Sequence, residues 1–484
     1  MRKLIEWHTV MEVTEYKQEQ TPSAEQHSAK MGTLPEGKLL WQMGVPLSLS
    51  MLILALYNIV DSIFVARLSE SALTAVTLAY PMFMLQVSVA VGTGVGINSL
   101  ISRQLGARRH EAANESANNG LFVMMLSCLA FVLFGLFGVR PFFHALTDIP
   151  ELREMGTTYL SICCTCSFGL FLQIFCERIK QSQGKNLYAM LMQILGAVIN
   201  IVFDPILIFG LWGFPKLGIA GAAYATVGGQ IVASLFSLVL VLSRRSEVRI
   251  RMRGFRPSGE IIRRIYAVGL PSAVMQSIGT VMNLVLNVLL ISFSTTAVAV
   301  LGAYSKVQSF ALMPLLGLTN GAMSIMAYNY GARNKARLMR TYRLTLVTGV
   351  VIMLFFTIVF ELFPVPILTL FGASSEMLSI GRAAFTVIPL ALPLAAYNIA
   401  TSNLFQAVGN GMYSMWMSLI RQLFVLVPAA WVLARVTGNV NSVWWSFLIA
   451  ELFALALCIG LFIRAYRQKI QQLDVGLMAE APVK

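Results

Sequence analysis

Charged residues are scarce in this 484-residue sequence. Asp, Glu, Lys and Arg make up 12% of it, and hydrophobic residues make up 57%. Ordinary globular chains contain roughly 25% charged and 45–50% apolar residues. The composition therefore excludes an ordinary soluble protein and predicts a polytopic helical membrane protein.

Histidine and cysteine are also few. The sequence has four His and six Cys. All four His lie outside the long apolar runs, and the cysteine-rich stretch Cys163-Cys164-x-Cys166 has no His or carboxylate beside it. A zinc or catalytic cluster is therefore not expected. No nucleophile, base and orienting group converge as an enzyme would require, and we expect neither an enzyme nor a bound cofactor.

The first 38 residues lack the apolar stretch of a signal peptide. They are rich in Gln, Glu and Ser, so we expect residues 1–38 to form a disordered cytoplasmic tail.

Long apolar runs fill most of the remaining chain. A transmembrane helix needs about 20 predominantly apolar residues. Twelve such runs are found, at 44–66, 79–101, 118–139, 155–176, 188–211, 218–242, 266–293, 303–327, 343–363, 384–406, 412–433 and 443–463. Their continuity excludes a β-barrel, whose strands alternate apolar and polar residues over about 10 positions. The predicted fold class is all-α with twelve transmembrane helices.

Lys and Arg gather on one predicted side of the membrane. Of the 36 basic residues, 28 lie in the two tails or in connections assigned to the same side. The positive-inside rule then places both termini in the cytoplasm of a multi-pass protein of the cell membrane. This asymmetry accounts for the net charge of +14, so no nucleic-acid partner is expected. A membrane-surface or nucleic-acid role for the basic run within 243–265 is the weaker alternative.

The two halves of the chain repeat each other at a spacing of 225 residues. Matching pairs are Gly44-Val45-Pro46 with Gly269-Leu270-Pro271, Asn58 with Asn283, Gly106-Ala107-Arg108 with Gly331-Ala332-Arg333, and Gln181 with Gln406. The repeat predicts two six-helix lobes, 39–242 and 266–463, with a basic linker at 243–265 and a cytoplasmic tail at 464–484. An even number of crossings per lobe relates the lobes by a pseudo-two-fold axis along the membrane normal, with a substrate site between them.

Two acidic residues lie within predicted transmembrane helices of the first lobe only. They are Asp61 and Asp204, and their repeat counterparts are Leu286 and Ala429. A buried acid costs at least about 2.5–3.5 kcal/mol on membrane-insertion scales. A folding role would be expected in both lobes, so the asymmetry favours a functional site over a structural polar cluster.

The partners of these acids fit a cation site. Tyr57 and Asn200 each lie one helical turn before an acid. Two neighbouring carboxylates with hydroxyl and amide partners can take up H⁺, or they can hold Na⁺ through oxygen ligands, at Asp61, Asn200 and Asp204. The sequence leaves both choices open.

Several motifs resemble the multidrug and toxic compound extrusion (MATE) family. They are Asn58-x-x-Asp61-x-x-Phe64, Arg103-Gln104-Leu105-Gly106-Ala107, Gln181-x-Gln183-Gly184, Asn200-x-x-x-Asp204-Pro205 and Gly218-x-Ala220-Gly221-Ala222-Ala223-x-x-Thr226. The resemblance covers both lobes. It implies a DinF-like member with a polar network in the first lobe, at Tyr57, Asp61, Asn200, Asp204 and Thr226, that governs cation-coupled efflux. We expect it to act as a monomer.

Four further residues are candidates for the substrate cleft: Asn58, Asn283, Lys306 and Glu451. Lys306 is alternatively expected to extend its ammonium group towards the membrane surface. Glu451 and Arg421 lie at similar depths on neighbouring predicted helices, and we favour a structural ion pair between them over a second coupling site.

The sequence therefore predicts an antiporter that exports amphipathic, often cationic, organic compounds by alternating access in exchange for Na⁺ or H⁺. The alternative is a flippase for lipid-linked oligosaccharides, which would need several cationic residues in its cleft. Lys306 and Arg421 are the only basic residues deep within predicted spans, so this alternative is the weaker one.

Overall fold

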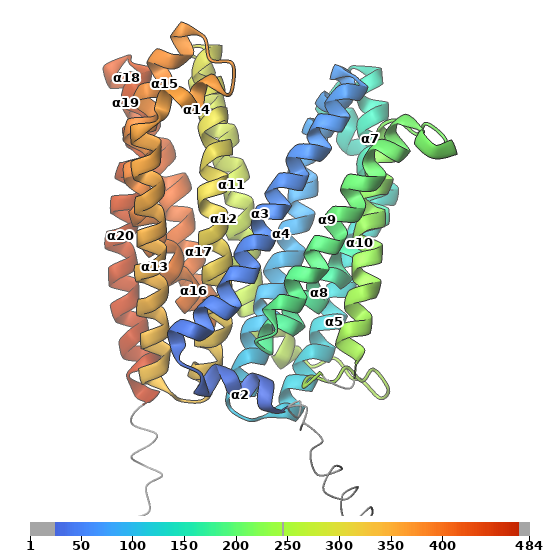
Figure 1. Cartoon of the computed structure of the whole chain (residues 1–484), viewed down its shortest axis with the longest axis vertical. Helices are drawn as coiled ribbons and strands as arrows, with labels where there is room; N and C mark the ends of the chain where they lie inside the picture. Colours follow the sequence, from blue (N-terminus) through green and yellow to red (C-terminus); the bar gives the residue numbers. More distant parts are fainter. Residues whose placement is uncertain (1–24, 244–245, 474–484) are drawn as a thin grey trace, which may run out of the picture.

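The structure, a computed structural model, describes residues 25–243 and 246–473. All regular structure in these residues is helical (Figure 1). A short helix, α2 (Glu25–Thr33), precedes the first lobe. The first lobe contains α3 (Glu36–Leu68), α4 (Glu70–Gly106), α5 (His110–Leu133), η1 (Phe134–Gly138), α6 (Val139–Leu146), α7 (Pro150–Thr165), α8 (Phe168–Ser182), α9 (Asn186–Phe209), η2 (Leu211–Gly213) and α10 (Ile219–Leu242).

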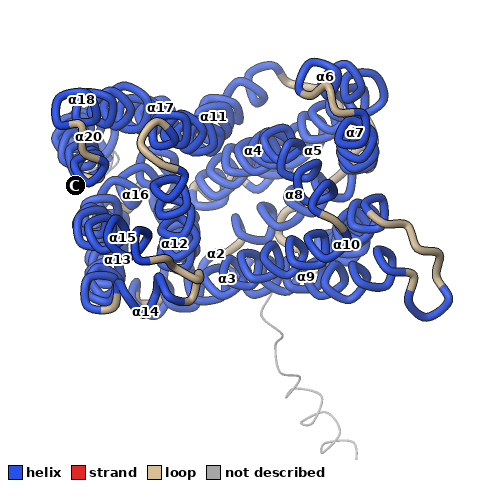
Figure 2. The backbone as a smooth tube through the Cα atoms, turned by 90° about the horizontal axis from the view of Figure 1, so that it is seen from above, coloured by secondary structure: helices blue, strands red, loops and turns tan. Residues whose placement is uncertain are grey.

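The second lobe begins with α11 (Gly259–Ile291). It continues with α12 (Thr295–Gly331), α13 (Lys335–Leu362), α14 (Pro364–Thr369), α15 (Ser375–Val387), η3 (Ile388–Ala391), α16 (Leu392–Ala407), α17 (Gly411–Leu419), η4 (Ile420–Leu426), α18 (Val427–Thr437), α19 (Val440–Val443), α20 (Trp445–Ala465) and η5 (Tyr466–Ile470). Figure 2 shows the two lobes as bundles lying side by side.

The twelve expected membrane crossings are confirmed within the described residues. Eleven helical segments are long and apolar enough to cross a membrane, and α7 with α8 forms a twelfth span that bends by 45°. Helices are the natural state of such runs, because lipid offers no partner for an unpaired backbone N–H or C=O.

The repeat seen in the sequence is visible in local structure. Ser69 caps the N-terminus of α4, and Ser294, its counterpart 225 residues later, caps α12 in the same way. Arg108 and Arg333 after these helices share a left-handed backbone, with φ of 56° and 55°. The two lobes therefore have equivalent turns as well as equivalent helices.

The lobes meet through two equivalent helix pairs, α4 with α11 and α3 with α12. Figure 1 shows that the lobes lie close together near α2 and diverge towards the opposite end. We call these the convergent end and the divergent end. At the convergent end, the helix termini at Gly106 and Gly331 pack against the backbone of the other lobe.

The N-terminal segment differs from the expected disordered tail. Residues 25–33 form α2, and α3 already begins at Glu36; residues 1–24 lie outside the described part. The segment packs against α4 of the first lobe and α12 of the second. The backbone N–H of Ser28 donates to Glu247 of the linker (2.8 Å), and Asn329 of α12 donates to the carbonyl of Met31 (3.0 Å). Capture by both lobes orders a stretch whose composition alone suggests disorder.

The other segment boundaries also shift. Residues 259–265, expected in the linker, form the first turns of α11, and the last helix of the chain runs on through η5 instead of ending at 463. Residues 474–484 of the expected C-terminal tail lie outside the described part. The helices are longer than the apolar runs because backbone hydrogen bonding continues past the hydrocarbon boundary.

Met31 anchors this segment, and its replacement gives a first prediction. Its side chain is fully buried and packs near Gly184 of the first lobe. Met31→Asp would bury an unpaired carboxylate, so we expect α2 to detach. Limited trypsin digestion should then cleave rapidly after exposed Lys30. Gly37→Ala, at a position with no atom within 4 Å, should leave cleavage slow; equal cleavage in both variants would contradict the anchoring role.

Candidate functional site

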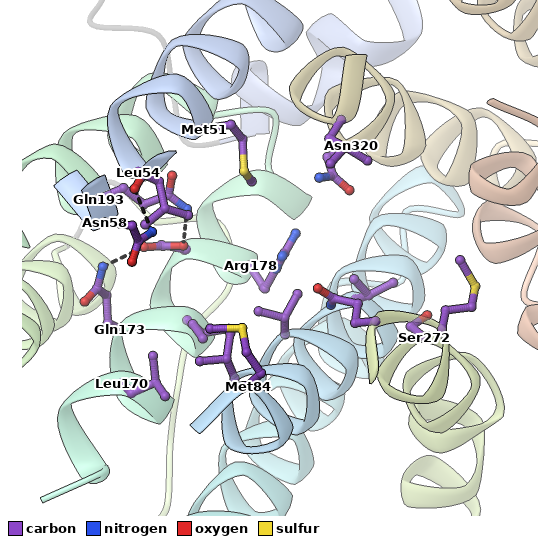
Figure 3. A pocket seen from close by; sticks show the side chains of 18 of the residues that line it. Met51, Leu54, Asn58, Met84, Leu170, Gln173, Arg178, Gln193, Ser272 and Asn320 are labelled. Atoms are coloured by element: carbon purple, nitrogen blue, oxygen red, sulfur yellow. Dashed lines mark hydrogen bonds between the residues drawn. The ribbon is translucent and has the colours of Figure 1, made fainter. Parts of the chain in front are cut away.

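A cavity of about 500 Å³ lies between the lobes. Helices α3, α4, α8, α9 and α10 of the first lobe line it, together with α11, α12, α16, α17 and η4 of the second. Its wall mixes apolar side chains, such as Met51 and Met84, with amides, such as Asn58 and Asn320 (Figure 3). Such a wall suits an amphipathic ligand.

The acid pair predicted from the sequence is brought together. Asp61 on α3 and Asp204 on α9 lie with their carboxyl groups within hydrogen-bonding contact of each other. Asp204 is fully buried, and Oδ1 of Asp61 is buried with no hydrogen-bond partner in the described part of the chain. The pair therefore has unused oxygen capacity, as a site for a proton or a small cation requires.

Asn200 connects the pair to α10. In the orientation that satisfies both ends of its amide, its nitrogen donates to Oδ2 of Asp204 (3.1 Å). Its oxygen accepts from the backbone N–H and from the hydroxyl of Thr226, at 3.2 Å each. The structure thus places Thr226, which only the resemblance suggested, in the same network.

Tyr57 lies on the cavity side of this network. Tyr57, Asn200 and Thr226 line the cavity, whereas the two acids lie behind that wall. The acid site and the cavity therefore share three side chains. A change at one can alter the shape of the other without direct contact between their ligands.

Two residues near the acids were not predicted. Tyr159 on α7 is buried and lies close enough to Asp61, and to Cys163 one helical turn later, to interact electrostatically with both. The available signal was their spacing of four residues inside an apolar run, which places both on one helix face. A tyrosine and a cysteine in an apolar run are ordinary packing residues, so that signal is weak.

The expected ion pair of the second lobe is present. Arg421 on η4 pairs with Glu451 on α20, and Asn398 on α16 donates to the same carboxylate at 2.7 Å. Arg421 and Asn398 line the cavity, while Glu451 lies behind them. Glu451 therefore contributes to the cleft through its two partners.

Breaking this pair gives a second prediction. Removal of one member of a buried ion pair costs about 3–5 kcal/mol, because the other charge is left unpaired. We expect Arg421→Met to lower the thermal unfolding midpoint of the purified protein in detergent, and the double variant with Glu451→Met to recover most of the loss. A double variant as unstable as the single one would contradict a simple pairing role.

The other two cleft candidates lie elsewhere. Asn283 on α11 and Lys306 on α12 are exposed, and neither is among the residues that line the cavity. The structure does not place them on the wall of this cavity, so their role in the cleft stays a prediction. The repeat relates Asn283 to Asn58, which does line the cavity. Positions that are equivalent in the repeat can still have different surroundings in the two lobes.

The sequence interpretation also missed a charged group on α8. Residues 177–182 were assigned to a cytoplasmic connection, yet α8 extends through them and they are buried. Glu177 accepts hydrogen bonds from Gln173 and Gln193, both at 2.9 Å (Figure 3). Arg178 also lines the cavity. The four-residue spacing of Gln173 and Glu177 was the signal, but the apolar run ends at 176 and hid it.

Comparison with known proteins agrees with this architecture. The chain matches the MatE family over residues 46–206 and 271–432, one match in each lobe. It is 25% identical to the multidrug export protein MepA of Staphylococcus saprophyticus over 415 residues, which cover 86% of this chain and 90% of that one. It is also 25% identical to the FAD transporter of Shewanella oneidensis over 407 residues, with 82% and 88% covered.

Solved structures show the same fold. An outward-facing multidrug resistance MATE family transporter of the MOP superfamily superposes with a TM-score of 0.84 at 29% identity, covering 91% of this chain and 97% of that one. A MATE structure in the straight conformation gives a TM-score of 0.85 at 28% identity, with 92% and 98% covered.

Proposed function

Since the chain belongs to the MatE family, we propose that it exports amphipathic organic compounds, cationic ones among them, in exchange for Na⁺ or H⁺. Like the proteins that it resembles, it is a multi-pass membrane transporter and not an enzyme. The coupling ion enters at Asp61 and Asp204, and the exported compound occupies the cavity between the lobes.

The observation that carries this proposal is the contact between the two acids behind the cavity wall. Two carboxylates this close repel each other when both are ionised, most strongly where water is excluded. A proton or a sodium ion removes that repulsion. Occupancy therefore changes the energy of the α3–α9 contact and of the three side chains shared with the cavity.

The donor set is compatible with either ion. Na⁺ prefers oxygen ligands, which the carboxyl groups of Asp61 and Asp204 supply. The amide oxygen of Asn200 faces Thr226, so this amide would have to turn for its oxygen to join them. A proton needs only the carboxyl pair. In both cases the ion drives export only if it binds one conformation of the transporter more tightly than the other.

The convergent end supports alternating access. Contacts between α4 and α11 and between α3 and α12 close this end, while the cavity lies between the lobes. Opening this end and closing the divergent end would present the cavity to the other side of the membrane. Both ends of the described chain lie at the convergent end, and we assign this end to the cytoplasm. We also propose that the transporter acts as a monomer.

The test is export of a fluorescent amphiphile from proteoliposomes under an imposed Na⁺ gradient, an imposed pH gradient, or neither. We expect one gradient to accelerate export and the other to have little effect. Equal export under all three conditions would overturn cation coupling. The similar proteins include multidrug export proteins and an FAD transporter, and nothing in the described residues favours the flippase alternative.

A further inference from the structure

The charged side chains on the cavity wall differ in how fully they are paired or hydrogen-bonded. Three of the residues that line the cavity in the described part of the chain carry charge: Glu177, Arg178 and Arg421. Arg421 is neutralised by Glu451 behind it. Glu177 accepts a hydrogen bond on each of its two oxygens from a glutamine amide. Arg178 is the charge that remains incompletely satisfied.

Arg178 is buried and its guanidinium is only partly hydrogen-bonded. The residue is 5% exposed, and one terminal nitrogen donates to Oε1 of Gln181 at 2.9 Å. Its Nε is buried without any hydrogen-bond partner. Among the described residues, the neighbouring Glu177 attracts it electrostatically but does not form a close ion pair with it. A buried donor left in this state costs free energy, which a ligand acceptor would recover.

The direction of the Arg178 side chain is fixed by α4. A Cβ at Gly94 would lie 2.8 Å from Cγ of Arg178 and 3.3 Å from its Nε, so the side chain runs directly over that glycine. Figure 3 shows Arg178 projecting among the side chains that line the cavity, between its helix and the side of the cavity that carries Asn320 and Ser272. The guanidinium is therefore held in place before any ligand arrives.

We propose that Arg178 binds an anionic group of the exported compound, a carboxylate in the simplest case. This inference rests on the proposed export function and narrows its substrates to amphiphiles that carry such a group, zwitterions included. A guanidinium presents paired N–H donors that match the two oxygens of a carboxylate. The apolar part of the compound would lie against side chains such as Met51, Leu54 and Met84 on the same wall.

The adjacent Glu177 makes zwitterions the favoured class. Glu177 lines the cavity next to Arg178 on α8, so a ligand can meet both signs of charge within one helical turn. A compound with only a positive charge gains nothing from Arg178. A compound with a carboxylate at one point and a delocalised cation at another supplies the missing acceptor of Arg178 and brings its positive charge near the negative charge of Glu177.

Two dyes with the same ring system provide the test. Rhodamine 110 has a free carboxylate, whereas rhodamine 123 is its methyl ester and has only the positive charge. Binding of each to the purified protein is measured by fluorescence anisotropy, and export by the proteoliposome assay. We expect Arg178→Gln to weaken rhodamine 110 binding about 10- to 100-fold, as expected for losing charge-assisted hydrogen bonds, and to leave rhodamine 123 binding nearly unchanged.

Two further variants guard against loss of folding. Arg178→Lys keeps the charge without the paired donors and should weaken rhodamine 110 binding less than Arg178→Gln does. Arg140→Gln changes an exposed arginine on α6 and should change nothing. Each variant is first checked by size-exclusion chromatography.

The outcomes separate the two proposals. Failure of wild-type protein to bind rhodamine 110, or equal effects of Arg178→Gln on both dyes, would overturn the anion site. Selective loss of rhodamine 110 binding with export that ignores both ion gradients would keep the anion site and refute cation-coupled export.

Discussion

Asp61→Asn is expected to reduce gradient-driven export to the level of vesicles without protein. The variant removes one of two carboxyl groups in contact, and with it the repulsion that ion binding relieves. An ion that binds two conformations with equal affinity does not shift the equilibrium between them, so it cannot drive export. The measurement is dye export in proteoliposomes, with and without the gradient that drives the wild type.

Asp148→Asn is the matched control, because the side chain of Asp148 is fully exposed and lies outside the pair. It should retain full coupling. Asp204→Asn should also lose coupling, and because Asp204 is fully buried and accepts a hydrogen bond from Asn200, it should also perturb the cavity wall. Full gradient-driven export by Asp61→Asn would refute the site, whatever the result for Asp204.

Dye binding separates loss of coupling from loss of the cavity. Asp61 lies behind the wall, so Asp61→Asn should bind the dye with an affinity close to that of the wild type. Loss of gradient-driven export with unchanged dye affinity would identify Asp61 as an ion site. Loss of both would mean that the acid supports the wall instead.

The sequence predicted the features of the site that follow from the free-energy cost of burying a carboxylate and from the internal repeat. A carboxylate in an apolar helix is expensive wherever the helix packs, so Asp61 and Asp204 could be selected without knowing their neighbours. Their absence from the other repeat then favoured a functional site over a folding role. The contact between them needed the structure only for confirmation.

Positions predicted from the sequence were wrong where the hydropathy of a segment does not match the burial of its residues. Glu177 and Arg178 lie beyond the apolar run and look like residues of a basic connection, but α8 runs on and the lobes bury them. In the opposite direction, Asn283 lies within an apolar run and is exposed. Hydropathy measures how a segment partitions into lipid and carries no information about which face a second lobe covers.

Replacing the glycines at the convergent end is the second change with a large expected effect. A Cβ at Gly106 would lie 1.9 Å from the carbonyl oxygen of Tyr328, and a Cβ at Gly331 would lie 1.9 Å from that of Arg103. Both obstacles are backbone atoms of the other lobe, which no rotamer change can move. The two contacts are equivalent under the repeat, so they lie together where the lobes close.

Each alanine therefore opposes closure of this end. Overpacking a rigid contact costs about 1–3 kcal/mol, which shifts a conformational equilibrium by a factor of about 5–150. We expect Gly106→Ala combined with Gly331→Ala to hold the convergent end apart and to stop export. The protein should remain folded, because each lobe has a buried apolar cluster of its own, around Phe143 in the first lobe and around Tyr304 in the second.

The separation can be measured with spin labels at Glu111 and Ala336, two exposed positions related by the same repeat on α5 and α13. The labels are placed in a background without the six native cysteines. The double glycine variant should show a longer label-to-label distance than the parent. Gly302→Ala on α12, which meets no atom within 4 Å, should leave both the distance and export unchanged. If the glycine variant kept the parent distance but lost export, the block would lie outside this contact, and closure of the convergent end would not be what limits the cycle.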